Sequence, residues 1–435
     1  MSEGFETAKP IDNVISVHPE LTKLRLGAYA WESRAEEFDR LVSASQCELL
    51  ESIRIQVRRS IAATLLGSGQ MEDVRLQVEK HEADVVFVDH PLTPVQQRNL
   101  EKAWDAKVVD RTGLILEIFA SRARTREGVL QVELASLNYQ LGRLVRSWTH
   151  LERQRGGFGF MGGPGERQLE LDRRMIRVRI MALEKDLDKV SRMRATQRSG
   201  RKRKAIPTVA LVGYTNAGKS TLFNRLTESE VFAADQLFAT LDPTLRLLNL
   251  PNGRNLMLSD TVGFLQELPH ELVDAFKATL EEVVEADLIL HVRDAADPMF
   301  AEQGKVVLQT LEQLGLVGDL APPMLELLNK ADLVPGLQSH HAETIPGSRM
   351  VISATTGKGL DELLAMLGEW AGQGMHELTL TFDLSDGKAM AFCYEHGEVI
   401  SKTASDETVQ VKVRFSASGA GRFKLESGVH RLKEG

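Results

Sequence analysis

The sequence predicts an α/β fold: a P-loop domain joined to a small N-terminal α/β domain, a helical hairpin and a small α+β C-terminal domain. Three observations predict it. A glycine-rich loop follows an apolar strand at residues 208–212 and precedes a helical run. Two long stretches with apolar residues at three-to-four spacing enclose residues 156–165, six of which are glycine. Short apolar runs alternate with amphipathic stretches elsewhere.

These patterns divide the chain into four expected domains: residues 1–113, 114–204, 205–373 and 374–435. In the first domain we expect strands at 14–17, 85–88 and 107–109, and helices at 34–45, 71–82 and 94–103, which predicts a mainly parallel sheet. Thr93 and Pro94 form a helix-start signal. The turn at residues 67–69 could serve a second nucleotide site, but no lysine or phosphate-binding series follows. We therefore interpret it as the opening of the next helix.

The second domain is predicted to be an antiparallel helical hairpin. Apolar residues recur at helical spacing over residues 116–153 and 166–198. The six glycines and one proline of residues 156–165 cannot continue a helix, so these ten residues are expected to form the tip loop. A basic run at residues 201–204 would be a solvated linker. In the last domain, alternating patterns predict strands at 378–384 and 409–415 and a short helix at 388–396.

The composition indicates a soluble, cytoplasmic protein. Of 435 residues, 43% are hydrophobic and 26% are charged, and no apolar run approaches the ~18 residues that a membrane helix needs. The first nine residues lack the apolar stretch of a secretory signal. Cys47 and Cys393 lie far apart, which excludes a disulfide framework and is typical of a reduced compartment. We expect no integral membrane segment, while peripheral membrane association stays open.

The net charge of −8 conceals a basic segment. From Arg111 to Lys204 there are 22 Lys and Arg against 10 Asp and Glu, a local net charge of +12, so the rest of the chain carries −20. Phe158, Phe160 and Met161 in the tip loop could stack on or wedge between bases. The alternative is a solvated face whose apolar residues pack on a neighbouring domain. The arginines that suit a phosphate backbone are Arg153, Arg155, Arg167, Arg173, Arg174, Arg177 and Arg179.

The loop after residues 208–212 matches the pattern GxxxxGK[ST]. Glycine is needed there because backbone N–H groups must converge on phosphate oxygens. Lys219 would offer a positive charge to the β- and γ-phosphates, and Ser220 a hydroxyl to Mg²⁺. The alternative, a glycine-rich turn without a ligand, is disfavoured by the flanking strand and helix. The expected binding residues are Gly213, Tyr214, Thr215, Asn216, Ala217, Gly218, Lys219 and Ser220.

A DxxG pattern ends a predicted strand about 40 residues after the P-loop, within the spacing of a nucleotide domain. Its aspartate would hold Mg²⁺ through water, and its glycine leaves room for a backbone N–H to meet the γ-phosphate. The expected residues are Asp260, Thr261, Val262 and Gly263.

A loop between these two motifs carries a threonine that would close over Mg²⁺ only when GTP is bound. We assign this role to Thr240 and interpret Thr244 as the start of the next strand. The magnesium ligands are thus expected to be Ser220, Thr240 and Asp260. The loop residues expected at the nucleotide are Phe238, Ala239, Thr240, Leu241 and Asp242.

A third motif predicts guanine recognition. The Asp332 carboxylate would accept hydrogen bonds from the guanine N1–H and exocyclic amine, which adenine lacks. Asn329 would fix the loop, and the Lys330 stem would pack over the base. The residues involved are Asn329, Lys330, Ala331 and Asp332, together with Ser353, Ala354 and Thr355 after the last strand, where a backbone N–H would meet the guanine O6. In this order, each after a strand, the motifs predict a GTPase domain rather than an ATP-binding one.

Phe264 stands directly after DxxG, where many GTPases place a glutamine that orients the attacking water. Because the Phe264 side chain cannot donate or accept a hydrogen bond, we expect slow hydrolysis without a partner. Asn216 resembles the P-loop asparagine of K⁺-activated GTPases; the alternative is an asparagine chosen for its turn geometry. The residues expected to act in catalysis are Lys219, Thr240, Gly263 and Asn216.

Together with the nucleotide motifs, the segments at residues 110–116, 122–125, 131–135, 163–174, 238–244 and 264–269 closely resemble the HflX family. This resemblance implies a GTPase that binds the large ribosomal subunit and splits or rescues stalled ribosomes under stress. Residues 156–165 would then enter ribosomal RNA. Arg167 and Leu171 depart from the polar, threonine-like residues expected there.

Two alternatives share every pocket residue: a ribosome-assembly GTPase, and a signalling GTPase whose hairpin docks a protein partner. Binding to mature or to precursor particles distinguishes the first, and a steep salt dependence favours nucleic acid over the second. We expect a monomer that binds ribosomal RNA and no DNA. Mg²⁺ is the expected cofactor of GTP and GDP, and K⁺ is a second candidate through Asn216.

Overall fold

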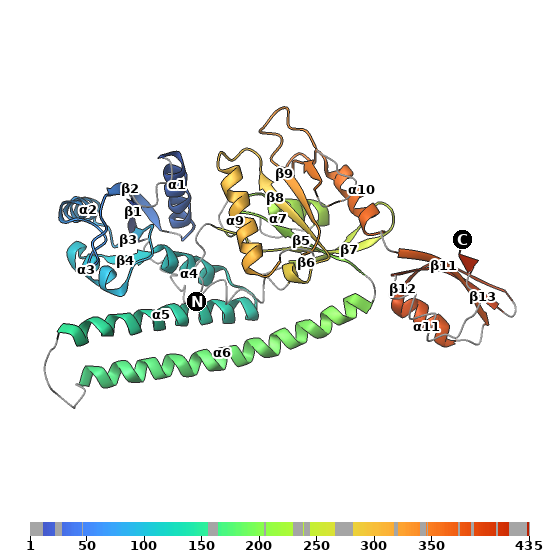
Figure 1. Ribbon diagram of the computed structural model, residues 1–435, viewed down its shortest axis with the longest axis horizontal. Helices are drawn as coiled ribbons and strands as arrows, with labels where there is room; N and C mark the ends of the chain where they lie inside the picture. Colours follow the sequence, from blue (N-terminus) through green and yellow to red (C-terminus); the bar gives the residue numbers. More distant parts are fainter. Residues whose placement is uncertain are drawn as a thin grey trace, which may run out of the picture.

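The computed structural model describes residues 12–21, 28–45, 47–154, 164–203, 206–228, 238, 244–265, 282–316, 321–339, 345, 347–372, 375–383, 387–405, 408–416 and 433–434. Three sheets with the helices around them and a pair of long helices make up this part of the chain, which confirms the predicted α/β class (Figure 1). Within the described ranges, no helix is both long and apolar enough to cross a membrane. The domain boundaries after residues 113, 204 and 373 stay predictions.

The N-terminal sheet is parallel throughout, which agrees with the predicted mainly parallel sheet, and its strand order is β2-β1-β3-β4. Strand β2 is not predicted from the sequence, because its charged residues interrupt the apolar pattern at the edge of the sheet. The strands are β1 (Asn13–Leu21), β2 (Glu48–Val57), β3 (Val85–Val88) and β4 (Lys107–Asp110), and the helices between them are α1 (Ala28–Ala44), α2 (Ser68–His81) and α3 (Pro94–Trp104).

The predicted helix start at Thr93 and Pro94 is confirmed, whereas α1 and α2 begin earlier than predicted, at Ala28 and Ser68. Thr93 precedes α3, its Oγ1 accepts the Gln96 N–H at 3.2 Å, and the Gln96 side chain accepts the Thr93 N–H at 2.9 Å. This reciprocal pair satisfies two donors that a helix leaves unpaired at its start. Gly67 is the residue before α2, so the turn at residues 67–69 opens a helix, as interpreted.

The long helix expected over residues 116–153 is instead two helices, α4 (Arg111–Arg122) and α5 (Arg126–Gln154). Ala123 leaves the helical conformation, with φ −62° and ψ 116°, and Thr125 Oγ1 accepts the Gly128 N–H at 3.0 Å. Thr125 thus caps a new helix. The prediction of one helix was wrong because the apolar spacing continues on both sides of this break.

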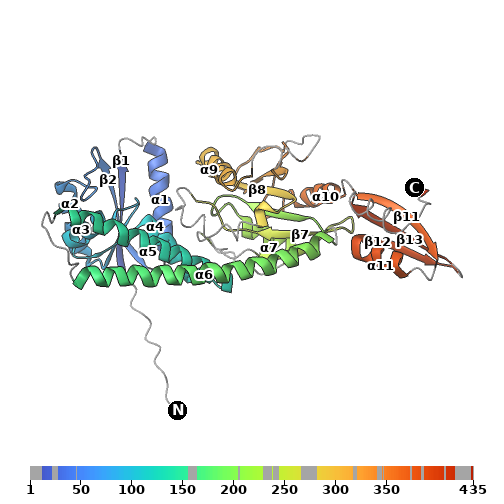
Figure 2. The same ribbon diagram turned by 60° about the horizontal axis from the view of Figure 1, so that its bottom comes forward.

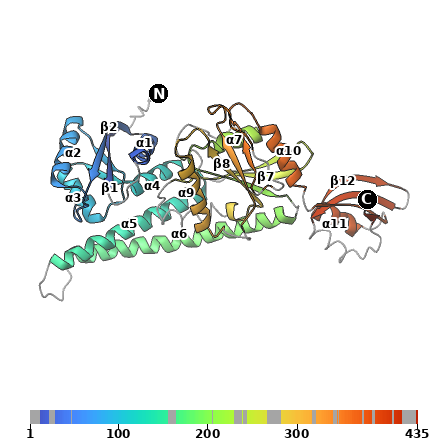
Figure 3. The ribbon, with the colours of Figure 1, turned by 45° about the horizontal axis from the view of Figure 1, so that its top comes forward.

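The second helix of the hairpin, α6 (Pro164–Arg203), lies beside α5 and runs in the opposite direction (Figures 1 and 3). Its 40 residues span about 60 Å. Pro164 and Gly165, expected in the tip loop, lie in the first turn of α6, where the fixed φ of proline suits a helix start. Residues 156–163, the rest of the predicted tip, lie outside the described residues.

The central sheet has the order β10-β9-β8-β5-β7-β6, and only the β6–β7 pair is antiparallel. The parallel strands bring their carboxyl ends to one edge, where ligands bind in open α/β sheets. The strands are β5 (Thr208–Val212), β6 (Thr244–Asn249), β7 (Asn255–Asp260), β8 (Leu288–Asp294), β9 (Met324–Asn329) and β10 (Arg349–Val351), with helices α7 (Lys219–Thr227), α9 (Phe300–Gln313) and α10 (Leu360–Trp370).

The C-terminal sheet is antiparallel, in the order β12-β13-β11-β14, and lies at the end of the molecule opposite the N-terminal sheet (Figure 2). Its predicted strands and helix are present, while β12 is not predicted from the sequence. The elements are β11 (Met375–Asp383), α11 (Gly387–His396), β12 (Gly397–Ala404), β13 (Thr408–Ser416) and β14 (Lys433–Glu434).

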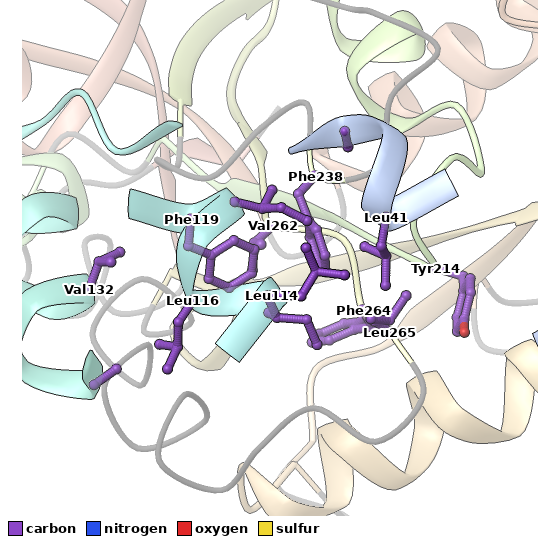
Figure 4. Close-up of a cluster of buried hydrophobic side chains, with 14 of the residues drawn as sticks. Leu41, Leu114, Leu116, Phe119, Val132, Tyr214, Phe238, Val262, Phe264 and Leu265 are labelled. Atoms are coloured by element: carbon purple, nitrogen blue, oxygen red, sulfur yellow. The ribbon is translucent and has the colours of Figure 1, made fainter. Parts of the chain in front are cut away.

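One buried apolar cluster joins the N-terminal sheet, the hairpin and the central sheet (Figure 4). We call it the junction core. Within it, the rings of Phe119 from α4 and Phe238 from the central domain meet edge to face, with centroids 4.6 Å apart. The labelled members are Leu41, Leu114, Leu116, Phe119, Val132, Tyr214, Phe238, Val262, Phe264 and Leu265.

Replacing Phe119 by alanine should lower the free energy of unfolding by about 3–5 kcal/mol, because the side chain is 1% exposed and its removal leaves a cavity in the junction core. Leu76→Ala on α2 is the matched control, since Leu76 is 50% exposed and its replacement should change stability by less than about 0.5 kcal/mol. Urea denaturation measures both variants. Equal effects would show that the junction core does not stabilise the fold.

Candidate guanine-nucleotide site

The predicted nucleotide motifs meet at the carboxyl edge of the central sheet. The P-loop follows β5, DxxG begins with the last residue of β7, and the guanine motif begins with the last residue of β9. Ser353 and Ala354 follow β10 and are buried. Ala239, Thr240, Leu241 and Asp242 lie outside the described residues, so the structure places only Phe238 of that loop.

The P-loop requires glycine where it crosses the neighbouring strands. A Cβ on Gly213 would lie 2.1 Å from the carbonyl oxygen of Val292 on β8. Gly218 has φ 92°, and a Cβ there would lie 2.2 Å from Nδ2 of Asn329. Asn216 also has a positive φ, 59°, which asparagine tolerates better than most residues. The backbone is therefore held in the tight conformation that a phosphate-binding loop needs.

Lys219 lies beneath this loop and is 6% exposed. Its Nζ donates to the carbonyl oxygens of Gly213 at 3.0 Å and Tyr214 at 2.8 Å. Burial lowers the pKa of Lys219 to about 8, although the nearby Asp260 carboxylate opposes this shift. A Cβ on Gly263 would lie 3.1 Å from the same Nζ, so the end of DxxG lies directly beside the lysine.

Two of the expected magnesium ligands are in contact. Ser220 Oγ donates to Asp260 Oδ2 at 2.8 Å, and Asp260 is fully buried. A hydroxyl and a carboxylate oxygen at this separation are the oxygen ligands that Mg²⁺ takes in nucleotide sites, so the residues suit the ion. The third expected ligand, Thr240, lies outside the described residues.

The guanine motif is tied to the P-loop and to the loop after β10. Asn329 Nδ2 donates to the Ala217 carbonyl at 2.8 Å, and its Oδ1 accepts the Ala354 N–H at 2.9 Å. Asp332 accepts a hydrogen bond from Ser353 Oγ at 2.6 Å, which lowers the pKa of the Asp332 carboxyl. Asp332 is thus ionised at neutral pH and can accept from a donor.

Lys330 and Ala331 complete the motif. Lys330 has φ 61°, and its Nζ lies 2.7 Å from Asp294 Oδ2. Ala331 is buried. The ion pair fixes the lysine beside the end of β8, where its stem can pack on a base.

Helix α1 of the N-terminal domain forms one wall of a cavity of about 360 Å³ at this site. The other walls come from the P-loop, the end of β8 and the guanine motif. Sequence reasoning missed the α1 residues, because acidic residues one turn apart on a helix are the pattern of any solvated face. The main lining residues are Glu32, Glu36, Glu37, Arg40, Tyr214, Thr215, Asn216, Asp294, Asp297 and Lys330.

Phe264 is held against the P-loop. Its N–H donates to the Gly213 carbonyl at 3.1 Å, and its carbonyl accepts the Thr215 N–H at 2.8 Å. Its ring is fully buried in the junction core. The residue after DxxG therefore offers no side-chain group to a water molecule.

Three models of GTPase families match successive parts of the chain, and named relatives match most of it. Residues 32–120 match a family model described as GTP-binding GTPase N-terminal, residues 122–201 match GTP-binding GTPase Middle Region, and residues 208–330 match 50S ribosome-binding GTPase. A protein of Magnetococcus marinus named GTPase HflX is 48% identical over 391 residues, covering 90% of each chain. Its namesake in Escherichia coli K12 is 44% identical over 384 residues, 87% of this chain and 89% of that protein.

Among solved structures, a GTP-binding protein of Sulfolobus solfataricus in complex with GDP is similar, with 23% identity and a TM-score of 0.43. The match covers 83% of this chain and 99% of that chain.

Above pH 8, binding of GDP should be accompanied by uptake of a proton from the buffer. Burial lowers the pKa of Lys219 to about 8, and a phosphate beside it would favour the charged form and raise that pKa. Affinity for GDP is therefore greatest below pH 8. It falls as pH rises above the pKa that Lys219 has in the nucleotide-free protein, by up to about tenfold per pH unit. Calorimetry at pH 8.5 in two buffers of different ionisation enthalpy measures the uptake.

Lys219→Arg is the control, because arginine stays charged and should bind without proton uptake. Any proton exchange by the guanine base is the same for both proteins, so it cancels when their proton uptakes are subtracted. Absence of proton uptake by the unmodified protein would contradict the prediction.

Proposed function

We propose a function from one premise: the chain belongs to the HflX family of GTPases. It hydrolyses GTP to GDP and phosphate. We propose that it binds the large ribosomal subunit and couples GTP binding and hydrolysis to the splitting or rescue of stalled ribosomes under stress. The observation that carries the ribosomal part is the match of residues 208–330 to the family described as 50S ribosome-binding GTPase.

The proposed roles follow from the contacts at the sheet edge. Lys219 neutralises the β- and γ-phosphates from beneath the P-loop, and Gly263 presents a backbone N–H to the γ-phosphate. Ser220 and Asp260 hold Mg²⁺, which supplies positive charge to the phosphates, and Thr240 completes that site when GTP is bound. Asp332 accepts from the guanine N1–H and amine. Asn216 is proposed to hold a K⁺ ion.

Hydrolysis requires a water molecule placed for attack on the γ-phosphorus, after which the bond to the β–γ bridging oxygen breaks. Phe264 cannot orient that water, since its ring is buried and its backbone is paired with the P-loop. We propose that the bound ribosome stimulates turnover by ordering the loops that carry Thr240 and Phe264. Equal turnover with and without ribosomes would contradict this step.

The hairpin is proposed to be the arm that reaches RNA. On the described part of α6, Arg174, Arg177 and Arg179 are exposed, and apolar residues emerge beside them. Leu171, Met175, Val178 and Met181 are 53%, 69%, 55% and 60% exposed. Charged and apolar side chains on one exposed helix suit a nucleic-acid surface, where cations bind phosphates and apolar groups contact sugars and bases.

We propose that the protein is a cytoplasmic monomer and that it binds no DNA.

Co-sedimentation with ribosomal subunits tests the proposal, with GDP, a non-hydrolysable GTP analogue or no nucleotide. We expect binding to the large subunit with the GTP analogue. A protein lacking residues 156–165 should bind yet fail to split ribosomes, because those residues are the proposed working end. Binding only to precursor particles would favour an assembly role, and binding to neither would overturn the proposal.

The double variant Arg174→Glu, Arg177→Glu should weaken large-subunit binding and reduce the slope of log affinity against log salt concentration by about 2, one unit for each arginine–phosphate pair that it removes. Lys402→Glu, which changes an exposed lysine on β12, is the control and should bind as the unmodified protein does. An unchanged salt slope in the double variant would exclude α6 as an RNA-binding element.

Asp332→Asn should change the base preference of the site from guanine to xanthine. The amide no longer accepts from both guanine donors but can donate to the xanthine 2-oxygen, and removing a hydrogen bond to a charged group costs about 1.5–3 kcal/mol, or about 10- to 150-fold in affinity. Asp361→Asn, on the exposed first turn of α10, is the control. Calorimetry with GDP and xanthosine diphosphate measures both variants; undiminished guanine preference would show that the base pocket is wrongly assigned.

A further inference from the structure

A second cavity, of about 590 Å³, lies between α9 and the β10 edge of the central sheet. None of its lining residues belongs to the nucleotide motifs. Its volume is within the range of small-molecule sites in proteins. The lining residues are His291 and Arg293 from β8, Ala301, Gly304, Lys305 and Leu308 from α9, Met324 and Glu326 from β9, and Gly347, Ser348 and Arg349 around the start of β10.

Positive charge predominates in this cavity. The lining contains three cationic side chains, Arg293, Lys305 and Arg349, and one anionic side chain, Glu326, so its net charge is +2. The Glu326 carboxylate is shared between the two guanidinium groups, which it contacts through separate oxygens. Burial alone would raise the pKa of Glu326, but hydrogen bonds from the two arginines lower it, so the carboxylate stays ionised. One carboxylate cannot neutralise three cations.

His291 supplies a second, independent observation. The side chain is 3% exposed, and its Nε2 has no hydrogen-bond partner among the residues that the structure describes. Burial, and then the charge of Arg293, lower the pKa of His291 to about 4, so the ring is neutral at physiological pH. A buried polar atom left unpaired costs about 1–3 kcal/mol. His291 is one of the residues that line the cavity, so this unpaired nitrogen lies within the cavity wall.

Arg293, on the same strand as His291, is held in place by its neighbours. The Arg293 guanidinium lies 3.5 Å from the Phe300 ring centroid, and its terminal nitrogen donates to the Phe300 carbonyl at 2.7 Å. A Cβ on Gly304 would lie 2.7 Å from the same guanidinium, so glycine leaves the space that this arginine occupies. The Arg293 Nε has no hydrogen-bond partner among the described residues.

We propose that this cavity binds a small organic phosphate. The three cationic side chains provide donors for a phosphate group, with guanidinium groups matching its oxygens in pairs. Ala301, Leu308 and Met324 provide an apolar surface for the body of the same molecule. Neither feature alone suits the cavity: inorganic phosphate leaves the apolar surface unused, and an uncharged molecule leaves the cations without a partner.

The test is calorimetric titration of the full chain, saturated with Mg²⁺ and GDP so that the P-loop is filled. The probes are phenyl phosphate, inorganic phosphate and phenol. We expect saturable one-to-one binding of phenyl phosphate, with affinity at least about tenfold greater than that of inorganic phosphate or phenol. Absence of saturable binding at millimolar phenyl phosphate would overturn the proposal. Equal binding of inorganic phosphate would overturn the apolar part and reduce the site to one for free anions.

Lys305→Met and Arg349→Gln locate the binding site, because both side chains are exposed and their replacement should leave the fold intact. Each variant should weaken phenyl phosphate binding about tenfold or more, the effect of removing one charged donor. Lys80→Met, on the exposed surface of α2, is the matched control and should bind as the unmodified protein does. Unchanged affinity in the first two variants would place the binding elsewhere and overturn the assignment.

Discussion

The backbone pairing between Phe264 and the P-loop is the constraint on which the arrangement of the site depends. It fixes the segment after DxxG to the phosphate loop through two hydrogen bonds, while the Phe264 ring is buried in the junction core. Gly263, which is proposed to meet the γ-phosphate, lies beside Thr215 and Lys219, and the residues before and after it are packed in the junction core together with α4. Because packed interiors do not deform continuously, a shift of this segment must be accommodated by the junction core as well.

A set of buried charges connects the same domains. Arg111 at the start of α4 is 2% exposed and lies 2.8 Å from Asp89 and 2.7 Å from Glu37, which also accepts a hydrogen bond from the Tyr214 hydroxyl of the P-loop. Burial alone would lower the pKa of Arg111, but the two carboxylates raise it and keep the guanidinium charged. Breaking a buried ion pair costs about 3–5 kcal/mol. This set therefore stabilises one placement of α1 and α4 against the P-loop, in addition to the apolar contacts.

What could be predicted from the sequence is what depends on neighbouring residues. The P-loop, DxxG and guanine motifs are short and follow apolar strands, and Thr93 caps α3 through a residue three positions away. The break at Thr125 carries the same kind of local signal, but the continuous apolar spacing of the two helices outweighed it. The α1 wall and the contact between Phe119 and Phe238 join residues far apart in the chain, and no local pattern encodes such a pairing. The roles of the site residues stay predictions for a different reason, because they depend on a ligand as well as on the chain.

Contacts within the protein hold the P-loop in its conformation. Asn216 and Gly218 adopt positive φ angles, and Gly213 passes so close to β8 that a side chain would collide with it. Asn329 holds the loop from the opposite side through the Ala217 carbonyl. A flexible loop would have to lose conformational entropy on binding, whereas a loop ordered during folding has already lost it. The free energy that folds the sheet and the junction core therefore also prepares the backbone for a phosphate, and a mutation that loosens either should weaken nucleotide binding without touching a motif.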